Sequence, residues 1–143
     1  MLSTVDIWDK LVALAADLEG VQEAKALPLH RVRNAEFLKR FPGLKLPAVL
    51  IVNLGHTTTA RGAALDRERR WAIIVITRDP KGDAYRDAVT IADSIETGML
   101  DQQVDIKSET LTIHATVDVE PVLTSDQDGV YELAATTREV YTR

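Results

Sequence analysis

The sequence of 143 residues contains no cysteine, few aromatic residues and no long apolar run. Without cysteine, the chain forms no disulfide, no zinc–thiolate site and no cysteine nucleophile. No apolar run approaches the ~20 residues of a membrane-spanning helix. The first residues also lack the basic and apolar segments of a signal peptide. We therefore expect a chain that is not held by disulfides and does not enter a membrane.

The charge balance also bears on which partners the chain can bind. The formal net charge is −5, from 17 basic and 22 acidic residues. Direct nucleic-acid binding is not expected, because phosphate binding depends on clustered lysine and arginine. Hydrophobic residues make up 45% of the chain and charged residues 27%, which is typical of a globular protein.

The stretch from Leu46 to Asp79 dominates the pattern. Residues 46–52 and 71–77 are apolar runs rich in β-branched residues, and they predict two strands. Residues 55–70 between them are too many and too polar for a tight turn. We expect the strands either to continue as a projecting arm or to carry a mobile loop.

Residues 55–70 also hold the densest group of charges in the sequence. These are the candidate interaction residues Arg61, Asp66, Arg67, Glu68, Arg69 and Arg70. A solvated loop is the usual explanation of such a group. The functional alternative is an arm that binds another protein, because mixed charges suit a complementary protein surface.

Apolar periodicity predicts helices over residues 3–18 and 83–97. Ser3 and Asp6 resemble a capping box, Gly20 is placed to end the first helix, and Asp83 is a candidate N-cap. Residues 23–27 indicate a short strand, and residues 30–41 a loop with one helical turn.

The last part of the chain alternates apolar and polar residues, which predicts strands over 111–120 and 130–142 around an Asp-Gly turn. The element order is then α-β-β-β-α-β-β. The prediction is a single α+β domain over 1–143. It consists of a mainly antiparallel sheet of four to five strands, with two helices packed on one face and an arm or loop around 55–70.

The sequence favours no catalytic, metal or cofactor site. His30, His56 and His114 have no metal-ligand spacing, and solvated positions explain them better. Residues 126–129 resemble a fragment of a calcium loop but lack its closing glutamate, and a hairpin turn explains them more simply. Asp83 and Asp87 are explained by a helix cap and a solvated helix face.

The order of these stretches resembles a known family. An amphipathic helix is followed by Leu-Pro-Ala-Val-Leu-Ile-Val, a charged stretch and Trp-Ala-Ile-Ile-Val-Ile. Then come Asp-Ala-Tyr-Arg-Asp-Ala-Val and a terminal strand that ends Tyr-Glu-Leu-Ala-Ala-Thr-Thr-Arg-Glu-Val-Tyr. This pattern is similar to the tail-terminator, or tail-completion, proteins of long-tailed bacteriophages and prophages, including the Mu-like and lambda-like groups.

The resemblance implies a structural role without enzyme activity. Such proteins assemble, usually as a hexameric ring, on the head-proximal end of the tail tube, where they stop polymerisation and meet the head-completion proteins. The implied partners are the chain itself, the tail tube protein and the head-completion or connector proteins. The implied location is the virion tail, after assembly in the cytoplasm of the bacterial host. The arginines Arg61, Arg67, Arg69 and Arg70 would then contact acidic surfaces on sister subunits or the tube.

Two hypotheses from other classes remain open. Two helices on an antiparallel sheet also describe ferredoxin-like domains that bind small molecules and regulate other proteins. A small hydrolase that uses His56 or His30 with a carboxylate is the third hypothesis, and it predicts turnover that depends on the histidine.

Overall fold

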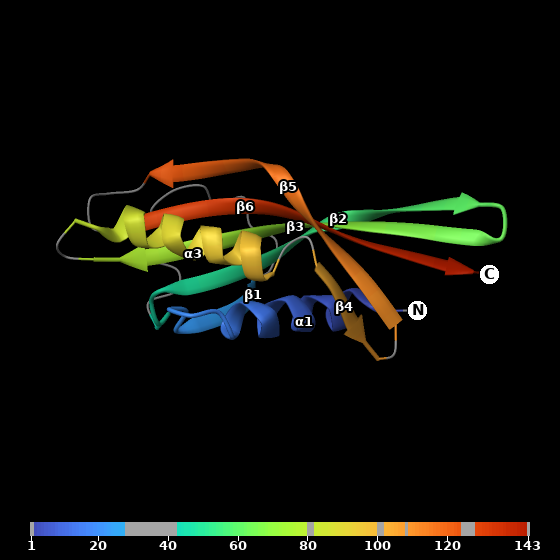
Figure 1. Cartoon of the computed structure of the whole chain (residues 1–143), viewed down its shortest axis with the longest axis horizontal. Helices are drawn as coiled ribbons and strands as arrows, with labels where there is room; N and C mark the ends of the chain where they lie inside the picture. Colours follow the sequence, from blue (N-terminus) through green and yellow to red (C-terminus); the bar gives the residue numbers. More distant parts are fainter. Residues whose placement is uncertain are drawn as a thin grey trace.

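The computed structural model describes residues 2–27, 43–79, 82–99, 102–107, 109–123 and 128–142. Within them the chain forms two helices and one six-stranded sheet (Figure 1). The elements are α1 (Thr4–Ala16), β1 (Glu23–Leu27), β2 (Ala48–Arg61), β3 (Ala64–Arg78), α3 (Ala84–Gly98), β4 (Gln102–Ile106), β5 (Glu109–Leu123) and β6 (Asp128–Thr142). The α+β class is confirmed. The predictions for residues 30–41 and for residues 125–127 of the predicted turn lie outside the described residues. Asp128 and Gly129, which were predicted to lie in that turn, instead begin β6, so this part of the prediction was wrong.

The sheet is larger than predicted, and it is mixed. Its strand order is β1-β2-β3-β6-β5-β4. The edge strand β1 runs parallel to β2, whereas the other neighbouring strands are antiparallel. Twenty residues separate Leu27 from Ala48 in the sequence. That is long enough for the crossover connection that a parallel pair requires.

The additional strand β4 forms a tight antiparallel hairpin with β5. Lys107, directly after β4, has a φ of 49° and supplies the left-handed conformation of this turn. The prediction of only two strands after the second helix was therefore wrong, because this turn carries no glycine or asparagine that marks it in the sequence.

The helix boundaries follow the predicted signals closely. At α1, the Ser3 hydroxyl accepts a hydrogen bond from the backbone nitrogen of Asp6 at 3.0 Å, and Asp6 Oδ2 accepts from Ser3 N at 3.3 Å. This is the predicted capping box. The helix ends at Ala16, and Gly20 adopts a φ of 87°. Asp83 precedes α3 at the N-cap, but its side chain makes no capping hydrogen bond.

The two helices pack against the same face of the sheet. Trp71, Ile73 and Val75 of β3 contribute to this core together with side chains of both helices. The rings of Trp8 and Trp71 lie 6.0 Å apart between centroids, and Trp8 Nε1 donates to the backbone oxygen of Ile51 at 2.8 Å. The alternate residues of β2 and β3 are buried on the opposite face. They belong to a second apolar cluster of Leu27, Leu50, Val52, Ala72, Ile74, Ile76 and Val130.

Burial on both faces explains why β2 and β3 read as continuous apolar runs. Neither described helix is long and apolar enough to cross a membrane.

Candidate functional site: a projecting arm

The polar stretch between the two apolar runs is part of a ribbon of β2, β3 and β6, and near its base β6 also pairs with β5, from Thr112↔Arg138 to His114↔Thr136. Strands β2 and β3 continue through it to Arg61 and Ala64, and Gly62, with a φ of 61°, occupies the turn between them. The last part of β6 runs beside β3, with pairs from Arg70↔Thr136 to Ala64↔Thr142. We call residues 54–70 together with 136–142 the arm. Figure 1 shows the arm extending beyond the part of the sheet that the helices cover.

A bulge marks the base of the arm. The register of β2 against β3 shifts between Asn53 and His56, and Gly55 has a φ of 106° there. The side-chain oxygen of Asn53 accepts a hydrogen bond from Gly55 N at 3.2 Å. Before the bulge, the odd-numbered residues of β2, such as Ile51, lie on the face that the helices cover. After the bulge, the even-numbered residues lie on that side. His56 and Thr58 therefore share a face with Arg69 and Arg67, their partners across the strand pair.

The face of the arm that continues the helix-covered side contains a buried ion pair. Arg69 lies two residues before Trp71 on β3, so both side chains are on the same face of the strand. The guanidinium of Arg69 contacts the carboxylate of Glu139. Both side chains are almost fully buried, at 1% and 2% exposure. Arg69 also donates to the backbone oxygen of Leu2 at 3.1 Å and to Thr4 Oγ1 at 3.2 Å. One guanidinium thus joins β3, β6 and the start of α1.

Two further hydrogen bonds hold this junction. The Tyr141 hydroxyl accepts from the backbone nitrogen of Leu2 at 2.9 Å, and Trp71 Nε1 donates to Thr137 Oγ1 at 2.9 Å. Both bonds connect β6 to residues far away in the sequence. The base of the arm is therefore fixed to the body by buried polar contacts on several elements.

The ionisation of Glu139 depends on its partner. Burial raises the pKa of the Glu139 carboxyl to about 7, against the opposing charges of Arg67 and the N-terminal amine. The adjacent guanidinium of Arg69 also favours the charged form. Glu139 Oε2 is buried without a hydrogen-bond partner among the described residues. The buried carboxylate thus depends on Arg69 for its hydrogen bond and its counterion.

This dependence predicts a pH effect in an Arg69→Met variant. The pKa of Glu139, already above its value of 4.5 in the unfolded chain, is then expected to rise further, because a neighbouring positive charge is lost. A raised folded-state pKa contributes stability below pH 4.5, and that contribution is lost as pH rises through the folded-state value. Both proteins are expected to lose stability as pH rises from about 4.5 to 7, and urea melts are expected to show Arg69→Met still losing stability above pH 7, where wild type levels off. Profiles of the two proteins that stay parallel above pH 7 would contradict this account of Glu139.

The opposite face of the arm, which we call the outer face, is exposed and carries alternating charge. Arg138 makes two hydrogen bonds to the carboxylate of Asp66, at 3.0 and 2.6 Å. This contact lowers the pKa of Asp66. Arg70 lies on the same face and reaches Thr57 Oγ1 at 3.4 Å. Glu68 and Arg61 are exposed beside them.

The structure separates the six residues singled out from the sequence. Arg61, Glu68 and Arg70 are exposed, whereas Asp66 and Arg67 are partly buried. Arg67 Nε donates to Thr58 Oγ1 at 3.2 Å. Arg69 belongs to the base of the arm and not to its surface.

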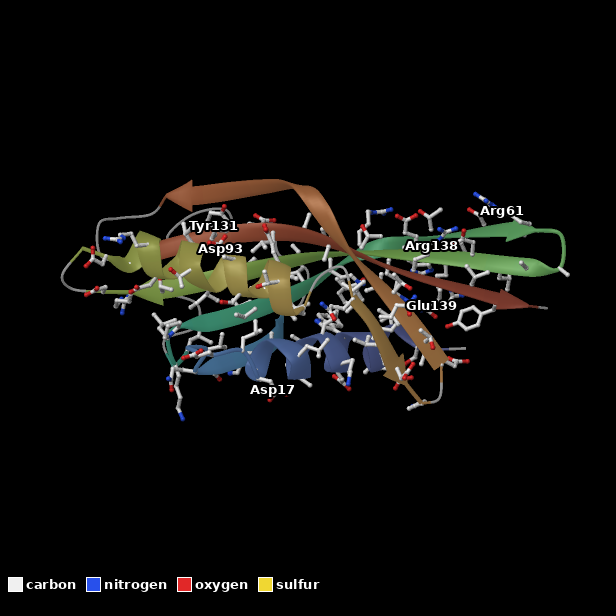
Figure 2. The ribbon with its side chains drawn as sticks, viewed as in Figure 1. Asp17, Arg61, Asp93, Tyr131, Arg138 and Glu139 are labelled. Atoms are coloured by element: carbon white, nitrogen blue, oxygen red, sulfur yellow. The ribbon has the colours of Figure 1, made fainter. Side chains whose placement is uncertain are left out.

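Sequence reasoning missed the partners of these residues on β6. Figure 2 shows Arg138 and Glu139 on the arm, with Arg61 closer to its tip. A signal for Glu139 was present, because it continues the alternation of the buried residues Leu133 and Ala135 on its strand. The sequence carried no signal that Glu139 pairs with Arg69, because the two residues are 70 positions apart.

The histidine and acidic positions considered in the sequence are only partly described. No group of three or more histidine, aspartate or glutamate side chains there is placed to hold a metal ion. His56 is exposed on the arm. His30 and the side chain of His114 lie outside the described part of the chain. Compared with known protein families the sequence matches none, and a search of curated proteins finds no match.

Proposed function

We propose that this protein caps the head-proximal end of a phage tail tube as an oligomeric ring and acts without enzyme activity. In this role it ends tube polymerisation and forms the surface that the head-completion proteins meet. Its place is the virion tail, after assembly in the host cytoplasm. The observation that carries the proposal is the arm, a ribbon that buried contacts on one face join to the body and that carries exposed charges on its outer face.

A cyclic ring needs two unlike surfaces on each copy, because every subunit contacts its neighbours head to tail. The outer face of the arm offers the exposed arginines Arg61 and Arg70, whereas the partly buried Arg67 lies on the other face. The helices offer the opposite charge. Exposed carboxylates on or beside α1 and α3 are those of Asp9, Asp17, Glu19, Asp83, Asp87, Asp93 and Glu96.

These two surfaces lie in different parts of the molecule. Figure 2 shows Asp17 and Asp93 on the helices and Arg61 near the tip of the arm. An arginine of the arm therefore reaches a helix carboxylate more readily on a neighbouring subunit than on its own. Complementary charges of this kind guide subunits into one register and disfavour wrong contacts.

The test is a tube-capping assay. The purified protein is mixed with the candidate tail tube protein from the same genome during polymerisation, and tube lengths are measured by electron microscopy. We expect tubes that stop growing, with a ring at one end only. Tubes of unchanged length without bound protein would contradict the proposal and direct attention to a ligand screen for a regulatory domain.

A further inference from the structure

Among the residues that the structure describes, the outer edge of β2 in the arm is an open strand. Strand β1 covers β2 only from Ala48 to Val52. Within the described part of the chain, no strand pairs with the outer edge of residues 54–61. Such an edge presents unpaired backbone N–H and C=O groups.

This edge lacks the usual protection against pairing. Proteins commonly protect exposed edges with lysine, proline or a bulge. Here the bulge lies at the base, and the run His56-Thr57-Thr58-Thr59-Ala60 beyond it contains neither lysine nor proline. Threonine is a good strand former. The edge is therefore suited to receive another strand.

We propose that the outer edge of β2 binds the same edge of a second copy of this chain, antiparallel, with the twofold axis at Thr58. In this register Thr58 faces Thr58 of the second copy, Thr57 faces Thr59, and His56 faces Ala60. The inference does not rest on the proposed function, because it concerns the protein free of any tube.

Self-complementarity is the reason to choose a second copy as the partner. A twofold contact requires a surface that fits itself, and twofold dimers are the commonest symmetric assemblies. The paired segment brings no like charges opposite each other, since its one charged residue, Arg61, faces Gly55. Threonine pairs across strands are favourable.

The ends of the segment add an apolar contact. Leu54 is 44% exposed at the base of the arm, and Ala63 is exposed at its tip. The antiparallel register brings the base of each arm to the tip of the other. Leu54 of one copy then lies near the turn at Gly62 and Ala63 of the second, and this contact occurs twice.

Charge placement gives the first test. In a Thr57→Lys/Thr59→Lys variant, each new lysine faces a lysine of the second copy. In a Thr57→Glu/Thr59→Glu variant, each glutamate faces a glutamate. We expect each variant alone to dimerise roughly tenfold more weakly than wild type in sedimentation velocity. An equimolar mixture is expected to recover the dimer, because every lysine then faces a glutamate.

Cysteine placement gives the second test, and the absence of native cysteine makes it specific. Directly opposed residues have Cβ atoms about 4.5–5.5 Å apart, whereas diagonal neighbours are about 7–8 Å apart. Under mild oxidation, Thr58→Cys is expected to form a covalent dimer. Thr57→Cys is the matched control and is expected to remain largely uncrosslinked, because Thr57 faces Thr59.

The outcomes separate the possibilities. A wild-type protein that stays monomeric at every concentration would overturn the proposal. So would a dimer that both charge variants leave intact, because it would form through another surface. Faster crosslinking at Thr57 than at Thr58 would refute the register. Circular dichroism melts of all variants verify that each one is folded.

Discussion

The Glu139→Leu variant is expected to lose about 3–5 kcal/mol of unfolding free energy. The loss follows from leaving Arg69 charged and buried without its counterion. Arginine remains protonated at any pH where the protein is folded, so it cannot escape the cost by neutralisation. Urea denaturation with linear extrapolation measures the change. Removing Glu139 is therefore expected to be more damaging at acid pH than removing Arg69, since Glu139 can take up a proton.

A double variant shows whether the loss of stability comes from leaving one buried charge unpaired or from losing the ion pair itself. Arg69→Met/Glu139→Leu removes both charges and keeps similar volumes. We expect it to recover most of the stability lost by Glu139→Leu, because replacing both members of a buried ion pair is often nearly neutral. Equal instability of the single and the double variant would show that packing or the bonds to Leu2 and Thr4 matter more than charge.

The neighbouring position on β6 provides the matched control. Arg138 also belongs to an ion pair with a carboxylate of β3, but its side chain is 46% exposed. Solvent screens such a pair, and its side chains lose entropy on pairing. Arg138→Leu is therefore expected to leave the unfolding free energy nearly unchanged. A loss as large as that of Glu139→Leu would mean that burial does not distinguish the two pairs.

Most of the predicted helices and strands were correct, whereas β4 was missed and the Asp-Gly pair predicted to form a turn begins β6. The strand over 23–27 and the capping box at Ser3 appear as predicted, because each rests on residues close together in the sequence. The parallel pairing of β1 with β2 could not be inferred in the same way. Parallel or antiparallel pairing is decided by the connection and by tertiary packing, and neither has a local pattern.

The candidate site was only partly predictable for a related reason. The group of charges at residues 61–70 was visible, but its division into a buried base and an exposed surface was not. That division depends on the register of β6 against β3, which places Glu139 next to Arg69. Arg69 continues the alternation of Trp71, Ile73 and Val75, so its inward direction was implied. An arginine at such a position was attributed to solvent because arginine is rarely fully buried unless paired.

Reversing the exposed arginines of the arm, Arg61→Glu/Arg70→Glu, is expected to abolish tube capping and leave the fold intact. Both side chains are exposed, so the unfolding free energy is expected to change little. A contact between the arm and an acidic surface would become repulsive, because each substitution replaces attraction by like-charge opposition. Tubes grown with the variant are expected to reach the length of tubes grown without any terminator, and no ring is expected at their ends.

The design depends on where each arginine lies. Arg69 is unsuitable for charge reversal, because a glutamate there would join Glu139 in a buried site and unfold the base of the arm. The control is Arg86→Glu, the same charge change at an exposed position of α3. Capping by the control but not by the arm variant would assign the contact to the arm. Both variants are expected to be stably folded. If both cap tubes, the arm is not needed for capping and another surface makes the contact.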